Sequence, residues 1–598
     1  MSILRKYIDE TKHAWEALTA EERRKYILSS LFMLGNSLLE LVAIGTVIPF
    51  LGIVASPSLL GRTSWGGWIL RSAPSIHFTT LILLLGAGIV FLFLVKNLVS
   101  YLLYSSENRF VFTLATEISR SKTRKYFAGS FPDFQESKGA EMLQKVAYAP
   151  VEFAQHIVLG SMTILSEGLV LLLFTAALLI YNPLLFLLIA GTVLPLAAVS
   201  WGLSARLLRR TRTTIQSASP VVLGRLSEAL MGYQEVKLYA REEFFVRRYL
   251  QEQESLNREL GRLNTANMIP IRLSELFAIG GIVLLLLFYS LLEGTVSPAA
   301  ISLMTIYAAF AYRAVPSTVK ILNSLVHFRT YAFTIGEVPP AIDRKDAPSA
   351  KAATESTTPF AFTRSIELKD ISLTYSGRRE TVLDRVSLII QKGELIGISG
   401  GSGNGKTTLA RIILQLLEQS SGAVLVDGKE LKEEERRRWQ SLAAYVAQDP
   451  LVLAESIRAN VAFGVPEAEI DEGRIQDALK ASGLARFVSG LPEGTGTHVG
   501  DQGKQLSAGQ KQRLVFARAL YRDADFYLFD EPTSHLDAGT ERLVLDTIGN
   551  LRLQGKTILL ISQKEEALAR CSDLYELSNG RLRRRPHLVH AEQTQRYA

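Results

Sequence analysis

The chain has 598 residues, which is more than one compact hydrophobic core usually supports and leaves room for two large domains. Its residues are 48% hydrophobic and 21% charged, and its mean hydropathy of +0.17 indicates that apolar and charged residues occupy separate stretches. The single cysteine, Cys571, excludes an intramolecular disulfide and a cysteine-rich metal site, and we interpret it as a buried or incidental thiol. The net charge of +8 would suit a nucleic-acid partner, but Lys and Arg mainly flank apolar segments, which favours a membrane protein.

The first 26 residues predict a cytoplasmic helix at the membrane interface. Basic residues at 5–6 are followed by a run of mixed charge at 21–25, ahead of the first apolar stretch. This pattern is too long and too mixed in sign for a secretory signal that is cleaved.

Six later stretches are apolar enough to cross a membrane as helices. A hydrocarbon layer of about 30 Å takes about 20 helical residues, and each stretch reaches this length. The first and last are long enough to tilt or to project beyond the bilayer. We place the predicted spans at residues 27–55, 79–104, 158–181, 183–207, 268–292 and 300–327.

The connections between the spans alternate in length and charge. Those after the second and fourth spans are long and rich in Arg and Lys, whereas the turn at 181–183 and the loop at 293–298 are short. Since cytoplasmic connections carry the excess of positive charge, both termini are expected in the cytoplasm. We predict that the long connections extend the membrane helices and turn at tips near 127–138 and 232–245. An amphipathic surface helix is the alternative for the second tip.

Five charged residues fall within the predicted spans, where an unpaired charge is costly, so each should face protein or a water-filled interior. They are Glu40, Lys96, Glu167, Glu275 and Arg313. For Glu40 and Arg313 two interpretations stay open: they line a polar cavity that contacts the substrate, or they form ion pairs that only hold helices together. For Lys96 and Glu275, pairing or snorkelling near a span end is favoured.

Residues 336–364 form a predicted linker, rich in Ala, Pro, Ser and Thr and without hydrophobic periodicity. The basic residues 581–585 near the C-terminus are interpreted as a solvated end or as one attracted to anionic lipid. The predicted organisation is therefore an interfacial helix at 1–26, a transmembrane domain at 27–335, the linker, an α/β P-loop domain at 365–586 and a tail at 587–598.

A phosphate-binding loop follows the first strands of the second domain. An apolar strand at 394–398 leads directly into a Gly-rich loop that opens a helix, which is the context that G-x-x-x-x-G-K-[ST] requires. The glycines allow backbone N–H groups to face phosphate oxygens, and the helix N-terminus adds a positive dipole. Lys406 is expected to neutralise the β and γ phosphates of ATP, and Thr407 to ligate Mg²⁺. The predicted nucleotide-binding residues of this loop are Gly400, Gly401, Ser402, Gly403, Asn404, Gly405, Lys406, Thr407 and Thr408.

Two acidic residues follow the apolar strand at 526–529. Asp530 suits the carboxylate on the metal side of the phosphates, and Glu531 is placed to polarise the water that attacks the γ phosphate. Capping of the next helix would explain either acid, but not their position directly after an apolar run. The two motifs together predict a P-loop ATPase.

The sequence between these motifs resembles that of the ABC transporter family. The segment 506–510, Leu-Ser-Ala-Gly-Gln, is similar to the LSGGQ signature, which a generic P-loop enzyme does not need. The resemblance implies that Tyr375 stacks on adenine, that Gln448 is the Q-loop glutamine beside the metal, and that residues 534–537 form the D-loop. Residues 500–503 resemble the segment that contacts the membrane domain in exporters. The resemblance covers essentially the whole chain and implies a six-span, type I ABC exporter-like domain before an ATPase domain of ABC type.

This resemblance also implies a dimer. In the family, the signature helix of one subunit points its N-terminus at the ATP held by the other. Ser507, Gly509, Gln510 and Asp537 are therefore expected to complete the nucleotide site of a second subunit. A chain with one copy of each motif is half of a transporter. Ala508 replaces the first signature glycine, and we expect little loss because the flanking signature residues remain.

Gln563 is the more consequential departure, since the family usually places a histidine there. Its amide can donate a hydrogen bond to the γ phosphate but cannot carry a proton or a positive charge. Such a change often marks the weaker site of a heterodimer, but the acid at Glu531, whose loss is the more usual degeneracy, is intact. We favour a homodimer with Glu531, Gln563 and Gln448 at its catalytic site, and a heterodimer stays open.

Two short segments give the best clue to the substrate. Residues 38–50 and 232–242 look similar to half-transporters that flip lipid-linked oligosaccharides or export related glycolipids. We therefore expect ATP-driven flipping of an amphipathic substrate across the cytoplasmic membrane, with no nucleic-acid partner. The alternative is a general exporter of lipids, peptides or drugs.

Overall fold

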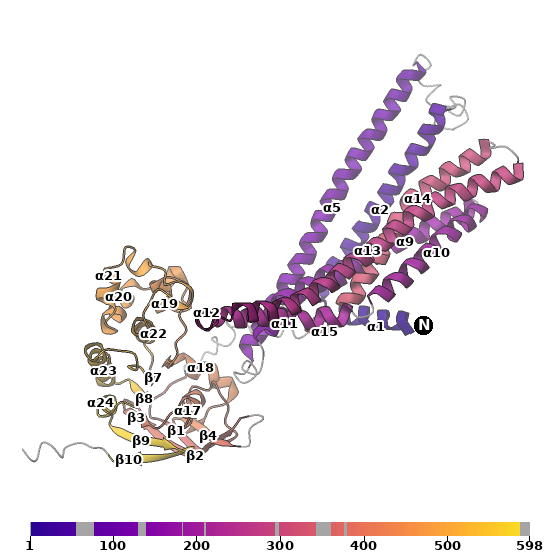
Figure 1. Ribbon diagram of the computed structural model, residues 1–598. Helices are drawn as coiled ribbons and strands as arrows, with labels where there is room; N and C mark the ends of the chain where they lie inside the picture. Colours follow the sequence, from indigo (N-terminus) through magenta and orange to yellow (C-terminus); the bar gives the residue numbers. More distant parts are fainter. Residues whose placement is uncertain are drawn as a thin grey trace, which may run out of the picture. The chain divides into compact units, whose positions relative to one another are not determined.

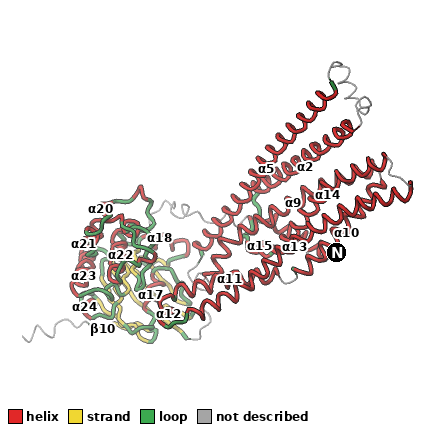
Figure 2. Tube along the Cα trace, turned by 45° about the horizontal axis from the view of Figure 1, so that its top comes forward, coloured by secondary structure: helices red, strands yellow, loops and turns green. Residues whose placement is uncertain are grey.

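The computed structural model describes residues 2–55, 77–129, 139–181, 183–208, 211–293, 298–341, 360–375 and 380–586. These residues form two compact units that divide near residue 348. The described part of the first unit is helical, and the strands lie in the second (Figures 1 and 2). The predicted tail at 587–598 and most of the predicted linker and of the first predicted tip lie outside the described residues.

Six long helices dominate the first unit, and in Figure 1 the pair α2 and α5 diverges from the other four toward one end. Two of them, α5 and α13, continue well beyond the apolar stretches 79–104 and 268–292, because the polar segments that follow or precede those stretches also have helical composition. The long helices are α2 (Ala20–Ala55), α5 (Phe78–Ala128), α9 (Leu159–Tyr181), α10 (Pro183–Leu207), α13 (Glu242–Glu293) and α14 (Pro298–Tyr331).

Among the described residues, four helical stretches are both long enough and apolar enough to cross a membrane: Ala20–Val47, Phe78–Ala128, Gly139–Ile180 and Glu242–Leu284. The chain is a multi-pass membrane protein. The remaining helices of this unit are short or polar. They are α1 (Ser2–Glu16), α7 (Gly139–Leu143), α8 (Ala149–Glu152), α11 (Thr211–Met231), α12 (Tyr233–Leu238) and α15 (Phe333–Glu337). The predicted tip at 232–245 thus contains the short helix α12.

Two π-helical turns, η1 (Gln144–Tyr148) and η2 (Phe153–Val158), interrupt the chain ahead of α9. Where a π-turn meets an α-helix, a backbone carbonyl can lack a partner within the helix, and a buried carbonyl needs one. Lys122 Nζ donates to the carbonyl of Lys145 at 2.7 Å, and the hydroxyl of Ser119 donates to the carbonyl of Val146 at 2.9 Å. Side chains of α5 therefore stabilise the irregular segment.

The second unit contains two sheets. One is antiparallel, with strand order β2-β1-β4-β5, and the other has the order β10-β9-β3-β8-β7-β6, in which β9 to β6 are parallel neighbours and β10 pairs antiparallel with β9. The strands are β1 (Ser365–Thr374), β2 (Thr381–Gln391), β3 (Leu395–Ser399), β4 (Ser421–Val426), β5 (Lys429–Glu430), β6 (Ala443–Val446), β7 (Phe526–Asp530), β8 (Thr557–Ile561), β9 (Asp573–Ser578) and β10 (Arg581–Arg585). The helices are α17 (Lys406–Ile413), α18 (Arg436–Ser441), α19 (Ile457–Val461), α20 (Glu472–Ala481), α21 (Ala485–Ser489), α22 (Ala508–Arg522), α23 (Ala538–Leu553) and α24 (Glu565–Leu568).

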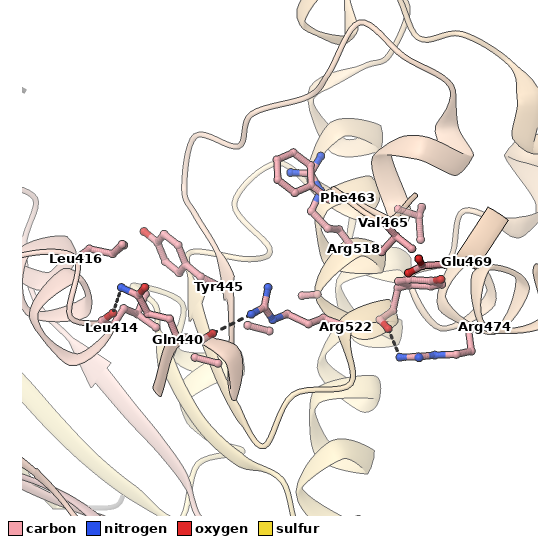
Figure 3. A pocket seen from close by; sticks show the side chains of 15 residues that line it. Leu414, Leu416, Gln440, Tyr445, Phe463, Val465, Glu469, Arg474, Arg518 and Arg522 are labelled. Carbon is pink, nitrogen blue, oxygen red and sulfur yellow. Dashed lines mark hydrogen bonds between the residues drawn. The ribbon is translucent and has the colours of Figure 1, made fainter. Parts of the chain in front are cut away.

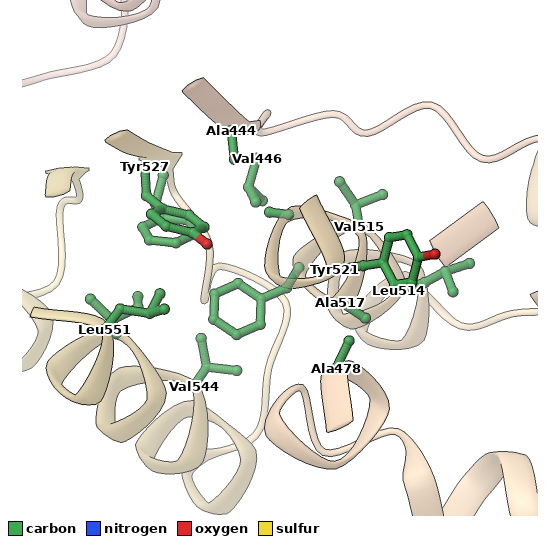
Figure 4. Close-up of a cluster of buried hydrophobic side chains, with 14 of the residues drawn as sticks. Ala444, Val446, Ala478, Leu514, Val515, Ala517, Tyr521, Tyr527, Val544 and Leu551 are labelled. Atoms are coloured by element: carbon green, nitrogen blue, oxygen red, sulfur yellow. The ribbon is translucent and has the colours of Figure 1, made fainter. Parts of the chain in front are cut away.

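Every residue of β3, β7 and β8 is buried, as expected for central parallel strands that are covered on both faces. Side chains from β6, β7, α20, α22 and α23 meet in one apolar cluster, shown in Figure 4. Val446, Tyr527, Ala478, Val515 and Val544 are among its members. This packing fixes α22, and with it the signature segment, on the sheet.

Residues 581–585, interpreted above as a solvated end or one attracted to anionic lipid, form the edge strand β10, and most of their side chains are exposed. Arg581 makes an ion pair with Asp384 at 2.7 Å, and Arg584 pairs with Asp573 of the neighbouring strand. The composition of the segment concealed its role because every second residue of an edge strand can point to solvent.

Candidate functional site

Three adjacent parallel strands, β3, β8 and β7, end at the same edge of the larger sheet. The Gly-rich loop follows β3, Asp530 ends β7, and Gln563 lies two residues after β8. Parallel strands bring their carboxyl ends together, which is where α/β sheets bind ligands. A cavity of about 260 Å³ opens there, lined by Tyr375, Val382, Ser402, Gly403, Gly405, Lys406, Thr407, Thr408, Gln448, Asp530, Glu531 and Gln563.

The Gly-rich loop has a shape that requires glycine at two positions. Gly400 has φ of 151°, and a Cβ there would lie 2.3 Å from the carbonyl oxygen of Leu577. Gly405 has φ of 92° where the loop enters α17. Lys406 Nζ donates to the loop's own carbonyls, at 2.8 Å to Gly400 and 2.9 Å to Gly401. The lysine is therefore held across the loop at the helix N-terminus, where phosphate is favoured.

Not every residue of the predicted loop faces the cavity. Gly400, Gly401 and Asn404 are absent from its lining. The amide of Asn404 instead donates to the carbonyl of Leu577 at 3.1 Å, which ties the loop to β9. Within this chain their contribution is to shape the loop.

A hydroxyl, a carboxylate and an amide converge on the metal side of the cavity. The hydroxyl of Thr407 donates to Asp530 Oδ2 at 2.9 Å, and Gln448 lines the same cavity. Burial raises the pKa of Asp530, which is only 1% exposed. These oxygen donors fit Mg²⁺, which usually takes one or two protein ligands together with phosphate oxygens and water. The described residues contain no cluster of three or more His, Cys, Asp or Glu that would hold a metal without phosphate.

Glu531 has a left-handed backbone, with φ of 55°. Such a conformation costs a residue other than glycine about 1–3 kcal/mol and persists only where the surroundings hold it. Its N–H donates to the carbonyl of Ile561 at 2.9 Å, and its own carbonyl accepts from Gln512 Nε2 at 2.7 Å. Its carboxylate accepts from Gln563 Nε2 at 2.9 Å. Both ends of the residue are thus fixed at the cavity.

The predicted signature residues lie elsewhere in the chain and do not line this cavity. Ser507 and Gln510 cap α22 reciprocally: the Ser507 hydroxyl accepts from the Gln510 N–H at 3.2 Å, and the Gln510 side chain accepts from the Ser507 N–H at 2.8 Å. Asp537 caps α23, and the hydrogen bond from the N–H of Thr540 lowers the pKa of Asp537. At Gly509 a Cβ would lie 2.8 Å from the carbonyl oxygen of His535. Both helix N-termini are thus capped by side chains of the predicted signature and D-loop segments.

Sequence reasoning did not identify three residues of this region. Val382 lines the cavity beside Tyr375, whose hydroxyl lies 3.2 Å from that of Thr408. Burial and the neighbouring Asp530 raise the pKa of Tyr445 to about 12. Gln512 lies two residues beyond Gln510 and faces the core of the unit. Because Gln512 lies on the signature helix, helical spacing from the apolar residues of that helix could have indicated that its side chain faces the core.

The charged residues of the predicted spans are largely paired. Arg313 Nη1 lies 3.1 Å from Glu167 Oε2, and Lys320 Nζ lies 2.7 Å from Glu167 Oε1. The hydroxyl of Ser317 accepts from Arg313 Nη1 at 2.6 Å and donates to Glu167 at 2.7 Å. Glu40 is further away, with 3.8 Å between its Oε2 and Arg313 Nη2. Helices α2, α9 and α14 thus share one charged network.

The same network borders a cavity of about 490 Å³, whose lining includes Glu40, Arg313 and Lys320. Arg313 is 3% exposed, and its Nε and Nη2 have no hydrogen-bond partner among the described residues. Arg313 is therefore ion-paired and also lines a cavity, and its contact with a substrate stays a prediction. Lys96 lies 5.9 Å over the ring of Phe93, and Glu275 pairs with Arg272 at 3.3 Å.

A wider groove of about 730 Å³ crosses the second unit between β6 and α22 (Figure 3). Arg518 lies 4.4 Å over the ring of Phe463 and donates to the carbonyl of Asn460 at 2.9 Å, while Arg522 donates to that of Gln440 at 2.9 Å. The groove therefore has fixed walls that are partly apolar and partly cationic.

The chain matches two family models. The ABC transporter transmembrane region matches residues 27–315, and the ABC transporter model matches residues 383–534. The chain is 28% identical over 503 residues to a protein of Xylella fastidiosa (strain Temecula1) named ATP-dependent lipid A-core flippase, which covers 83% of each chain. A protein of the same name from Burkholderia orbicola is 37% identical over 217 residues, 36% of each chain.

A solved structure titled "Structure of a bacterial Atm1-family ABC exporter with ATP bound" has the same fold. Its TM-score is 0.71 at 20% sequence identity, and the match covers 96% of both chains. The predicted fold class is confirmed. The chain belongs to the ABC transporter family, as an ATP-hydrolysing membrane transporter with the type I ABC exporter fold.

Proposed function

We propose that two copies of this chain form an exporter that flips a glycolipid or lipid-linked oligosaccharide across the cytoplasmic membrane, using ATP bound between the copies. The main support for a dimer is that the lining of the nucleotide cavity contains no residue of the signature segment. Lys406, Gln448, Asp530 and Glu531 line it, whereas Ser507 lies at another helix terminus of the chain. A second copy supplies the missing signature.

Within each site the residues have separate tasks. Lys406 binds the β and γ phosphates in place of its two loop carbonyls, and Tyr375 contacts the adenine ring. Thr407, Asp530 and Gln448 hold Mg²⁺, which neutralises phosphate charge when bound. Glu531 polarises the attacking water, and Gln563 donates to the γ phosphate.

The substrate class follows from the relatives that are named lipid A-core flippases. A lipid A-type or lipid-linked glycan carries phosphate, which guanidinium binds well. Arg313 has two unused donors beside the cavity of the membrane unit, and Lys320 lies in the same lining. We assign Arg313 to the anionic headgroup, while Glu40 is the acid that this headgroup displaces.

We also propose that the ATPase domain and both termini lie in the cytoplasm. This orientation agrees with the positive charge of the long connections.

Transport by the purified chain in proteoliposomes tests the proposal. The wild-type chain alone should hydrolyse ATP and move a labelled lipid A-type glycolipid between leaflets, and Glu531→Gln should lose both activities, by about 100-fold or more. Arg313→Gln should lower transport more than basal hydrolysis. Hydrolysis without glycolipid movement would favour the general exporter, and a purified chain that is inert would indicate a heterodimer.

A further inference from the structure

Gln512 is a buried amide whose hydrogen-bonding groups are all used. It is 2% exposed and lies on α22, five residues after the Ser507 cap. Its Nε2 donates to the carbonyl of Glu531 at 2.7 Å and to the hydroxyl of Ser534 at 3.2 Å. Its Oε1 accepts from the N–H of His535 at 3.2 Å. One side chain thus joins the signature helix to the segment that begins with the hydrolytic acid.

The bond to Glu531 acts on a strained residue. The left-handed backbone of Glu531 turns the chain directly after the buried strand β7, and its carbonyl must find a donor away from the strand ladder. The Ser534 hydroxyl also donates to this carbonyl, at 3.1 Å, but Gln512 makes the shorter bond and also holds Ser534. Without the amide, the Glu531 carbonyl would keep only the longer bond from Ser534, so the backbone conformation that directs the Glu531 carboxylate would be less firmly held.

Helix α22 therefore has two roles at different ends of one rigid element. Its N-terminus carries Ser507 and Gly509, which the proposed function assigns to the nucleotide of the second copy. Its body carries Gln512, which holds Glu531 of its own nucleotide site. A helix packed through Leu514, Val515 and Phe516 into the core moves as a unit, so a shift at one end reaches the other.

We propose that Gln512 is a positioning residue for hydrolysis: it maintains the left-handed conformation of Glu531 and links that conformation to the signature helix. The inference rests on the proposed function, because it requires Glu531 to act on the attacking water. Gln512 itself does not line the nucleotide cavity.

The test compares kcat and KM in the full-length chain. Gln512→Met keeps the length of the side chain but removes its donors and acceptor. We expect kcat for ATP hydrolysis to fall about 10- to 100-fold with KM for ATP unchanged, since misplacing a reacting group by about 1 Å costs rate and leaves the phosphate loop intact. The control is Gln415→Met, which removes a half-buried amide that donates to the carbonyl of Ile412 at 3.1 Å. It should leave kcat unchanged.

A double-mutant cycle distinguishes positioning from general destabilisation. In a Glu531→Gln background, Gln512→Met should produce no further loss, because the group it positions is already absent. An equal fold loss in both backgrounds would overturn the inference, as would a wild-type kcat in the single variant. If Gln512→Met does not fold, Ser534→Ala takes its place in the same cycle, with a smaller expected loss. Wild-type hydrolysis and its loss in Glu531→Gln test the proposed function separately.

Discussion

Gln563 Nε2 donates a 2.9 Å hydrogen bond to the carboxylate of Glu531, so the residue at the position where the resemblance leads us to expect a histidine contacts the proposed hydrolytic acid directly. The amide has no ionisable proton, and its donor is present at every pH at which the protein is folded. An imidazole at this position would titrate near pH 6.5. The substitution therefore removes the pH dependence of the donor in this contact.

This relationship predicts a change in the pH dependence of hydrolysis. Gln563→His should keep a donor near Glu531 and add an inflection between about pH 6 and 7 to the rate profile. Gln563→Ala should lower kcat about tenfold or more across the range, because the carboxylate loses its partner. The measurement is the ratio of variant to wild-type kcat from pH 5.5 to 8.5. A ratio for Gln563→His that stays constant over this range would contradict the prediction.

The buried carboxyl group of Asp530 is expected to lower the stability of the folded chain at neutral pH although hydrolysis requires it. Since burial raises its pKa in the folded state, the folded chain binds this proton more tightly than the unfolded chain. Its contribution to stability is therefore greatest below the ordinary pKa of Asp and declines as the pH rises through the raised value. At pH 7.5, without nucleotide or Mg²⁺, Asp530→Asn should raise the unfolding midpoint by about 2–4 °C and abolish hydrolysis.

Thermal unfolding in detergent with EDTA checks this prediction. Asp477→Asn is a matched control, because this acid is exposed on α20, and its midpoint should equal that of the wild type. If Asp530→Asn unfolds at a lower temperature than the wild type, burial of the charge is not the dominant effect at this position.

The ion pair between Arg313 and Glu167 predicts that a second substitution restores part of the stability that the first one removes. Glu167→Gln leaves Arg313 buried without a full countercharge and should cost about 3–5 kcal/mol. Adding Arg313→Gln removes the orphaned charge, so the double variant should be more stable than Glu167→Gln alone. The unfolding midpoints of the single and double variants in detergent measure both effects. The control is Glu275→Gln, which changes an exposed side chain paired with Arg272 and should shift the midpoint little. Additive losses in the double variant would argue against the pair.

The buried thiol of Cys571 should serve as a probe of unfolding. It is 4% exposed, and burial raises its pKa to about 12, so the reactive thiolate is scarce at pH 7.5. Since the chain has one cysteine, maleimide should label the denatured protein once and the native protein scarcely at all. Intact-mass spectrometry before and after denaturation measures this. Rapid labelling of native protein would show that the segment around α24 opens.

The local motifs were readable from the sequence because their chemistry depends on consecutive backbone positions. The loop from Gly400 to Thr408 must present N–H groups in order, and the apolar run before Asp530 and Glu531 predicts that these two acids lie where a buried strand ends. The fold class followed from these motifs and from hydropathy, and the family matches confirm it.

The contacts between distant elements were not readable in this way. A membrane helix is apolar on every side, so its hydropathy does not fix the rotation that turns Arg313 toward Glu167. The bond from Gln512 to Glu531 spans two elements that only tertiary packing brings together. The strand formed by residues 581–585 was not readable for a related reason, since Arg581 finds its partner, Asp384, on a strand far away in the sequence.

The self-contained bonding of Lys406 has a further consequence for the catalytic cycle. Because two carbonyls of its own loop hold the ammonium group, we expect the loop to keep its curvature between turnovers. Phosphate oxygens would then replace the two neutral carbonyls as acceptors for Lys406. Binding would gain charge-assisted hydrogen bonds without the entropy cost of ordering the loop. The chain therefore begins each round of hydrolysis with its recognition loop already preorganised.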